Sequence, residues 1–208
     1  MNIFRTLMDK PWTTEGLIDE LPEAGALSPA RTGLWLFLAV VTSLFGLFIS
    51  AYHMRAEYPD WVQLKDPGLL WLNTVVLVLT SVGFQYARNA AQAGRFEQMR
   101  AGLTAGGVLT LAFLAGQYTA WEQLLEAGYF LADNPAYAFF YLLTGVHGLH
   151  LVGGLWVWAR MTAKVWRGFD AENVVEVGRV RLSVELCTVY WHYLLLVWVV
   201  LFGLLLTT

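Results

Sequence analysis

The sequence predicts an all-α membrane protein, a bundle of five transmembrane helices. Of its 208 residues, 57% are hydrophobic and only 14% are charged, whereas globular domains carry about 25% charge. The charged residues are also clustered, and they leave five charge-free stretches that each reach the roughly 20 residues needed to cross a bilayer core as a helix. The surplus of apolar surface must therefore face lipid. This composition excludes a nucleic-acid-binding protein, a disordered chain and a disulfide scaffold.

The charge-free stretches also predict the domain organisation. Residues 1–31 are polar, contain several prolines and glycines, and lack the short apolar core of a signal peptide. We expect them to form a polar cytoplasmic segment, and residues 32–208 to form one five-helix transmembrane domain. The predicted spans are about 32–54, 67–87, 101–121, 134–159 and 184–206.

The distribution of Lys and Arg predicts the orientation of the spans. Eleven of these residues lie in the N-terminal segment, the second loop and the fourth loop, and the other two are Arg55 and Lys65 in the first loop. Because cytoplasmic loops carry an excess of Lys and Arg, we expect the N-terminus in the cytoplasm and the C-terminus outside. The single Cys187 lies in the fifth span and can form no intrachain disulfide.

Tryptophans and glycines predict how the spans meet the membrane and each other. Trp191 and Trp198 lie inside the fifth span, where we expect them to pack within the bundle. Gly102 and Gly106 in the third span have a spacing that lets another backbone approach closely, although glycine is common in membrane helices in any case. Five other tryptophans lie near predicted span ends, where amphipathic rings favour the headgroup level. They are Trp35, Trp71, Trp121, Trp156 and Trp158.

The few polar residues inside the spans are the candidates for function, because polar groups are costly in lipid. His147 and His150 are three residues apart, which predicts that they share one side of a helix. Glu185 and His192 are seven apart and are expected on one stripe. The rise of 1.5 Å per residue further predicts that His150 and His192 could meet at the same depth.

Three chemistries could use such a group: two imidazoles ligating a haem iron, three binding a transition metal, or an imidazole and a carboxylate relaying protons. The alternative is a buried histidine that hydrogen-bonds across helices and fixes their packing. With four histidines in the chain and no cysteine cluster, we favour this alternative and predict no catalytic, cofactor-binding or metal-binding residues. The predicted structural pins are His147, His150, Glu185 and His192.

Two segments resemble a known family. Residues 139–154 read FFYLLTGVHGLHLVGG and are similar to the "FF..TG.HG.HV..G" signature of subunit III of haem–copper respiratory oxidases. Residues 185–202 begin ELCTVYWHY and resemble that family's closing motif, a Glu seven positions before a His in Tyr-Trp-His. The resemblance covers about 32–208 and matches the short, five-span bacterial form. Other positions that match the family's motifs are Asn73, Gln117, Trp121, Glu122, Tyr190 and Trp191.

This resemblance implies a non-catalytic accessory subunit of a membrane haem–copper terminal oxidase in aerobic respiration, in the bacterial cytoplasmic (inner) membrane. The haems and copper are then expected in partner subunits. The chain is expected to stabilise the catalytic subunit, to hold phospholipid in a cleft between its helices and to support proton uptake, with a proton-antenna role for Glu185 as secondary. Arg88, Arg95 and Arg100 are the candidate contacts for lipid headgroups.

Two positions depart from the family pattern. Long-form members often carry a membrane-buried Glu where this chain has Val41, and an Asp is common where it has Leu195. Both differences argue against proton conduction through this subunit itself. The partner could be a cytochrome c oxidase, a quinol oxidase or a nitric-oxide-reducing relative. Alternatives from other classes are a small proton-coupled membrane carrier and a free-standing redox protein with haem between His150 and His192.

Overall fold

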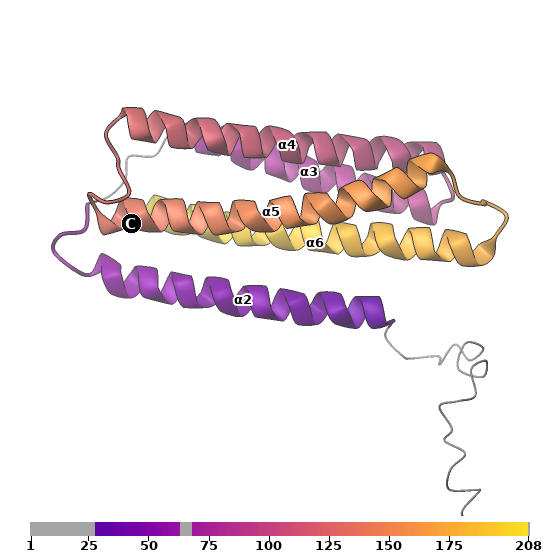
Figure 1. Ribbon diagram of the computed structural model, residues 1–208, viewed down its shortest axis with the longest axis horizontal. Helices are drawn as coiled ribbons and strands as arrows, with labels where there is room; N and C mark the ends of the chain where they lie inside the picture. Colours follow the sequence, from indigo (N-terminus) through magenta and orange to yellow (C-terminus); the bar gives the residue numbers. More distant parts are fainter. Residues whose placement is uncertain (1–27, 63–67, 208) are drawn as a thin grey trace, which may run out of the picture. The chain divides into compact units, whose positions relative to one another are not determined.

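The computed structural model describes residues 28–62 and 68–207. The chain divides into two units, Met1–Gly33 and Leu34–Thr208. In the first unit, residues 28–33 contain the first turn of a helix, and the other residues of the predicted cytoplasmic segment lie outside the described part. Within the described residues, five helices are long and apolar enough to cross a membrane, which confirms the predicted fold class (Figure 1). They are α2 (Pro29–Ala56), α3 (Leu69–Gln92), α4 (Phe96–Glu126), α5 (Pro135–Arg167) and α6 (Val174–Thr207).

Local sequence explains where several helices begin and end. Asn134 has an extended backbone, and its side chain accepts a hydrogen bond from the Ala136 N–H at 2.9 Å, while Pro135 occupies the first position of α5. Both features favour the start of a helix. Gly94 and Gly128 follow the last residues of α3 and α4 with φ of +70° and +87°. Glycine adopts this left-handed backbone without steric cost, so the chain can turn sharply at both places.

Successive helices in the second unit run in opposite directions (Figure 1). The two ends of this unit differ in charge. The α3–α4 and α5–α6 turns lie at one end, which carries Arg88, Arg100, Arg160 and Arg181. We call this the basic end, and the other the opposite end. The α4–α5 loop lies at the opposite end.

Helices α3 and α4 approach most closely where the sequence predicts close contact. A Cβ added to Gly102 would lie 2.9 Å from the backbone nitrogen of Ala87, and one added to Gly83 would lie 3.5 Å from the nitrogen of Gly106. No Cβ fits at Gly102 without displacing the Ala87 backbone, and at Gly83 a Cβ would just touch the α4 backbone. The small-residue spacing in α4 therefore has the structural role predicted for it.

Two tryptophans of α6 lie at the centre of the second unit, among mostly aliphatic core residues. Trp191 and Trp198 of α6 are 1% and 0% exposed, as the sequence predicts. Trp191 packs on Phe84 of α3 with ring centroids 4.4 Å apart, and Trp198 packs on Phe113 of α4 at 5.0 Å. The two rings thus fill the space between α6 and the α3–α4 pair at two different heights.

The loop after α2 contains an ion pair that makes stability depend on pH. The Arg55 Nη1 donates to Asp60 Oδ1 at 2.8 Å, and this hydrogen bond lowers the pKa of the Asp60 carboxyl. Because the native pKa lies below the ordinary value, the pair contributes stability above that ordinary value and loses it as the pH falls through the lowered pKa. The effect is small, since both groups are solvent-exposed.

We therefore expect Asp60→Asn to lower the thermal unfolding midpoint slightly at pH 7, and the difference from wild type to shrink as the pH falls below the ordinary aspartate pKa of about 3.9. Thermal scans of the detergent-purified protein across this range measure it. Glu57→Gln removes a charge from the same loop and serves as the control. A difference that stays constant with pH would rule out the ion pair as its source.

Candidate functional site

Tryptophan side chains supply four of the side-chain hydrogen bonds between helices in the described part of the chain. A buried indole N–H needs an acceptor, and in lipid such bonds help to hold helices together. The sequence pattern predicted this role for histidines, although tryptophans far inside apolar spans were a usable signal. The four indole bonds are Trp121 to Thr144 Oγ1 (3.2 Å), Trp158 to the Leu103 carbonyl (2.9 Å), Trp191 to Thr110 Oγ1 (2.9 Å) and Trp198 to Thr74 Oγ1 (3.0 Å).

Glu185 and His192 lie on one stripe of α6, and both connect α6 to α3. His192 Nδ1 lies 2.9 Å from Ser81 Oγ, and Glu185 Oε1 lies 3.6 Å from Arg88 Nη2. The predicted meeting of His192 with His150 of α5 does not occur. Both side chains contact α3, because this side of α6 packs on α3.

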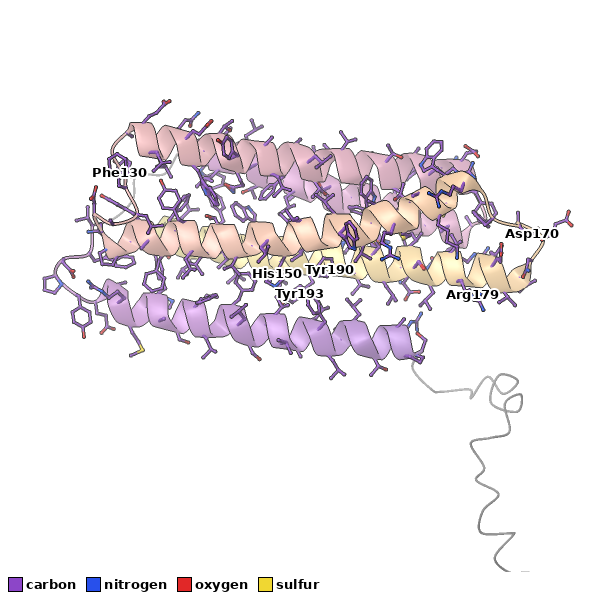
Figure 2. The ribbon with its side chains drawn as sticks, viewed as in Figure 1. Phe130, His150, Asp170, Arg179, Tyr190 and Tyr193 are labelled. Carbon is purple, nitrogen blue, oxygen red and sulfur yellow. The ribbon has the colours of Figure 1, made fainter. Side chains whose placement is uncertain are left out.

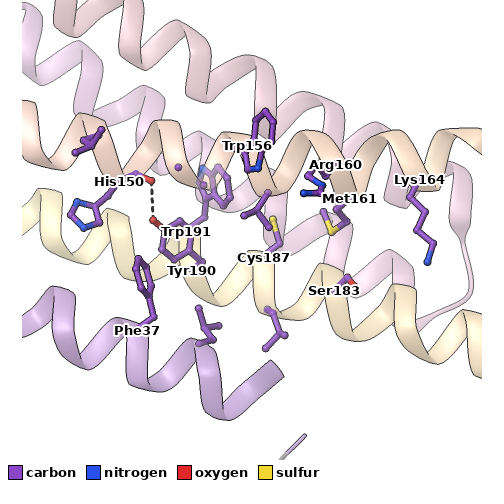
Figure 3. A pocket seen from close by; sticks show the side chains of 16 residues that line it. Phe37, His150, Trp156, Arg160, Met161, Lys164, Ser183, Cys187, Tyr190 and Trp191 are labelled. Carbon is purple, nitrogen blue, oxygen red and sulfur yellow. Dashed lines mark hydrogen bonds between the residues drawn. The ribbon is translucent and has the colours of Figure 1, made fainter. Parts of the chain in front are cut away.

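His150 faces α2 rather than another histidine. Its Nδ1 is 2.8 Å from the Val146 carbonyl of its own helix, and its ring lies 5.5 Å from Phe45. Its backbone carbonyl accepts a hydrogen bond from the Tyr190 hydroxyl at 2.8 Å, which connects α5 to α6 (Figure 3). In Figure 2, His150, Tyr190 and Tyr193 all lie on the side of the bundle that faces α2, and Tyr193 reaches Thr42 of α2 with a hydroxyl-to-hydroxyl distance of 2.9 Å.

His147 points in a different direction, into the core. It is fully buried, with its ring 5.2 Å from Trp198 and 6.1 Å from Phe113. His147 and His150 lie on one side of α5, as expected, but the 60° between residues three apart suffices to send one ring toward the core and the other toward α2. His150 and His192 do not pair, because one faces α2 and the other α3.

A cleft of about 870 Å³ lies between α2, α5 and α6 (Figure 3). Phe37, Trp156 and Tyr190 are among its mostly apolar and aromatic walls, and Arg160 and Lys164 line it toward the basic end. An apolar groove with cations at one end suits an amphipathic molecule with an anionic head. Among the described residues, no group of three or more His, Cys, Asp or Glu side chains is placed to hold a metal ion.

Comparison with known proteins decides the family. Residues 30–206 match the family model described as cytochrome c oxidase subunit III. The chain belongs to this family. A cytochrome c oxidase subunit 3 from Synechocystis sp. is 33% identical, over 82% of this chain and 72% of the relative. A cytochrome bo(3) ubiquinol oxidase subunit 3 from Pseudomonas aeruginosa is 26% identical, over 82% of this chain and 80% of the relative. This subunit III is thus an accessory subunit of a haem–copper terminal oxidase.

The subunit III motif positions have different environments in the structure. Asn73 and Gln117 are buried, Glu122 is exposed at the opposite end, and Tyr190 and Trp191 donate the hydrogen bonds described above. Both departures from the family pattern are apolar residues in the helices, with Val41 buried in α2 and Leu195 half-buried in α6.

The three arginines expected to contact lipid headgroups do not line the cleft of this subunit III. Arg88 faces Glu185, and Arg95 is exposed at the start of α4. Arg100 donates to Glu97 at 2.7 Å and to the Val165 carbonyl at 3.1 Å. The cations of the cleft are Arg160 and Lys164, which sequence reasoning did not single out, because their role depends on how α2 packs beside α5.

Proposed function

We propose that this subunit III holds phospholipid in the cleft between α2, α5 and α6 and stabilises the catalytic subunit without carrying haem or copper itself. The observation that carries the proposal is the apolar cleft with Arg160 and Lys164 near its basic end. We place the chain in the bacterial cytoplasmic membrane with the basic end in the cytoplasm, as the excess of Lys and Arg at that end indicates.

The chemistry of the cleft fits one lipid class. Its apolar walls match acyl chains, and its volume of about 870 Å³ falls in the range of small-molecule sites. Gly153 contributes no side chain, and a Cβ added there would meet nothing within 4 Å. Lys and Arg near a membrane surface attract anionic headgroups, so the double cation favours an anionic phospholipid over a zwitterionic one.

The test is the lipid retained by the purified oxidase. We expect Arg160→Gln with Lys164→Gln to reduce the anionic phospholipid found by mass spectrometry several-fold. The matched control is Arg167→Gln with Arg179→Gln, which removes two positive charges from exposed positions at the same end but outside the cleft. Equal retention by the cleft variant and wild type would contradict the proposal.

We further propose that the face formed by α3 and α6 docks on the catalytic subunit. His192 is exposed on this face, and the Arg88 and Glu185 side chains beside it are 31% and 26% exposed. Polar groups of this kind are costly against lipid but can hydrogen-bond to another protein. A heme-copper oxidase subunit I+III from Aeropyrum pernix, 26% identical over 84% of this chain and 22% of the relative, is named for both subunits in one chain, which supports pairing with subunit I.

A photo-crosslinking residue at the half-buried Gln85, one turn from both Ser81 and Arg88 in α3, tests this docking face. We expect it to form a covalent product with the catalytic subunit in native membranes, whereas the same residue at exposed Val108 of α4 does not. The reverse pattern would place the interface on α4.

Support of proton uptake is the last part of the proposal, with Glu185 as its candidate because it lies half-buried toward the basic end.

A further inference from the structure

We infer that the core binds water between α3, α4 and α5, at the level of Asn73, Gln117 and His147. The three side chains are 3%, 6% and 0% exposed. Together they hold five polar atoms without a hydrogen-bond partner: Asn73 Nδ2, both amide atoms of Gln117 and both ring nitrogens of His147. This site is separate from the lipid cleft and from the α3–α6 face, so it stands whether or not those proposals hold.

Asn73 and Gln117 lie at the same height because of how α3 packs on α4. The Asn73 side chain occupies the space where a Cβ on Gly116 would be, and its Oδ1 is the nearest atom to that point. Gly116 directly precedes Gln117 in α4. The Asn73 amide therefore reaches across to the α4 backbone beside Gln117.

His147 of α5 contributes a third polar side chain to the layer formed by Asn73 and Gln117. Its ring contacts Phe113, one turn before Gln117 in α4, at 6.1 Å between centroids. Trp121, one turn after Gln117, donates to Thr144, which precedes His147 by three residues. Because α4 and α5 run in opposite directions, these two contacts bracket Gln117 and place it within the turn of α5 that runs from Thr144 to His147.

Hydrogen bonds made directly among the Asn73, Gln117 and His147 side chains would leave some of their polar atoms without a partner. A Gln117 to His147 hydrogen bond would use two of the five atoms and leave three without a partner. Nearly all buried polar atoms in proteins are hydrogen-bonded to protein or to ordered water, and buried waters typically make about three hydrogen bonds to such groups. The layer offers amide donors, an amide acceptor and a ring nitrogen, which together match the two donors and two acceptors of a water molecule.

Two glycines make α5 thin near His147. A Cβ built on Gly148 would have only Leu114 Cδ2 within 4 Å, at 3.9 Å, and one built on Gly145 would lie 3.5 Å from its nearest neighbour in Trp121. Both glycines thus bring the α5 backbone close to α4 side chains beside His147. Water is the ligand class that fits a small space with several convergent polar groups.

A high-resolution cryo-EM map of the complete oxidase tests the inference directly. We expect density for at least one water within hydrogen-bonding distance of both Gln117 and His147. A map in which Gln117, His147 and Asn73 bond only to one another or to protein atoms, with no such density, would overturn it.

Variants give a second, independent readout. If water satisfies the layer, Gln117→Leu leaves that water and its partners without bonds, so we expect a lower thermal unfolding midpoint of the oxidase and loss of the water density. If the layer were dry, the same change would remove two unsatisfied atoms and raise the midpoint, which would refute the inference. Tyr118→Leu, at the neighbouring exposed position of α4, is the matched control and should leave the midpoint near that of wild type.

Discussion

Replacing Gly102 with valine should separate α3 from α4 and destabilise the bundle by about 1–3 kcal/mol or more. A Cβ at this position would lie 2.9 Å from both the Cβ and the backbone nitrogen of Ala87. The backbone cannot rotate away as a side chain can, so the two helices must move apart. Valine is no worse a helix former than glycine, and the loss therefore measures helix packing. The readout is the unfolding midpoint in a denaturing-detergent titration.

Gly46→Val is the matched control for this change. Gly46 lies in α2, and a Cβ added there would meet nothing within 4 Å. The same substitution therefore changes helix propensity and apolar surface without steric conflict, and it should leave the unfolding midpoint near the wild-type value. If both variants lost the same stability, close contact between α3 and α4 would not be the cause.

The features that depend on one helix at a time could be predicted from the sequence. The length of each apolar stretch determines whether it crosses the membrane, and the structure has a helix over each of the five. The close approach at Gly102 follows from residue size, and the burial of Trp198 follows from its depth in the span. Each of these predictions needed only the chain's own spacing and the thickness of the bilayer.

The features that depend on two helices could not be predicted in the same way. In a soluble helix the polar face marks the outside, but in lipid the outer and inner faces are both apolar. The rotation of α5 was therefore undetermined, and with it the directions of His147 and His150. The same ambiguity explains why the cations of the cleft, Arg160 and Lys164, could not be separated from the other basic residues at that end.

Replacing Trp198 with alanine should cost about 3–5 kcal/mol, the range for large buried aromatic residues. Trp198 is fully buried and contacts Phe113, His147 and Phe202. Its loss leaves a cavity where α3, α4, α5 and α6 meet, and it also removes the hydrogen bond to Thr74. Because lipid is as apolar as the core, the loss of packing rather than transfer from water should dominate this cost.

Two further variants separate packing from hydrogen bonding. Trp198→Phe keeps most of the ring but loses the indole N–H, so it should cost about 1 kcal/mol for the bond to Thr74 plus a part of the packing. Trp35→Ala removes a ring that is 60% exposed on α2 and should have little effect on the unfolding midpoint in detergent. If Trp198→Ala were no more destabilising than Trp35→Ala, the tryptophans of α6 would not hold the bundle together, and the hydrogen bonds from His192 and Tyr190 would have to do so instead.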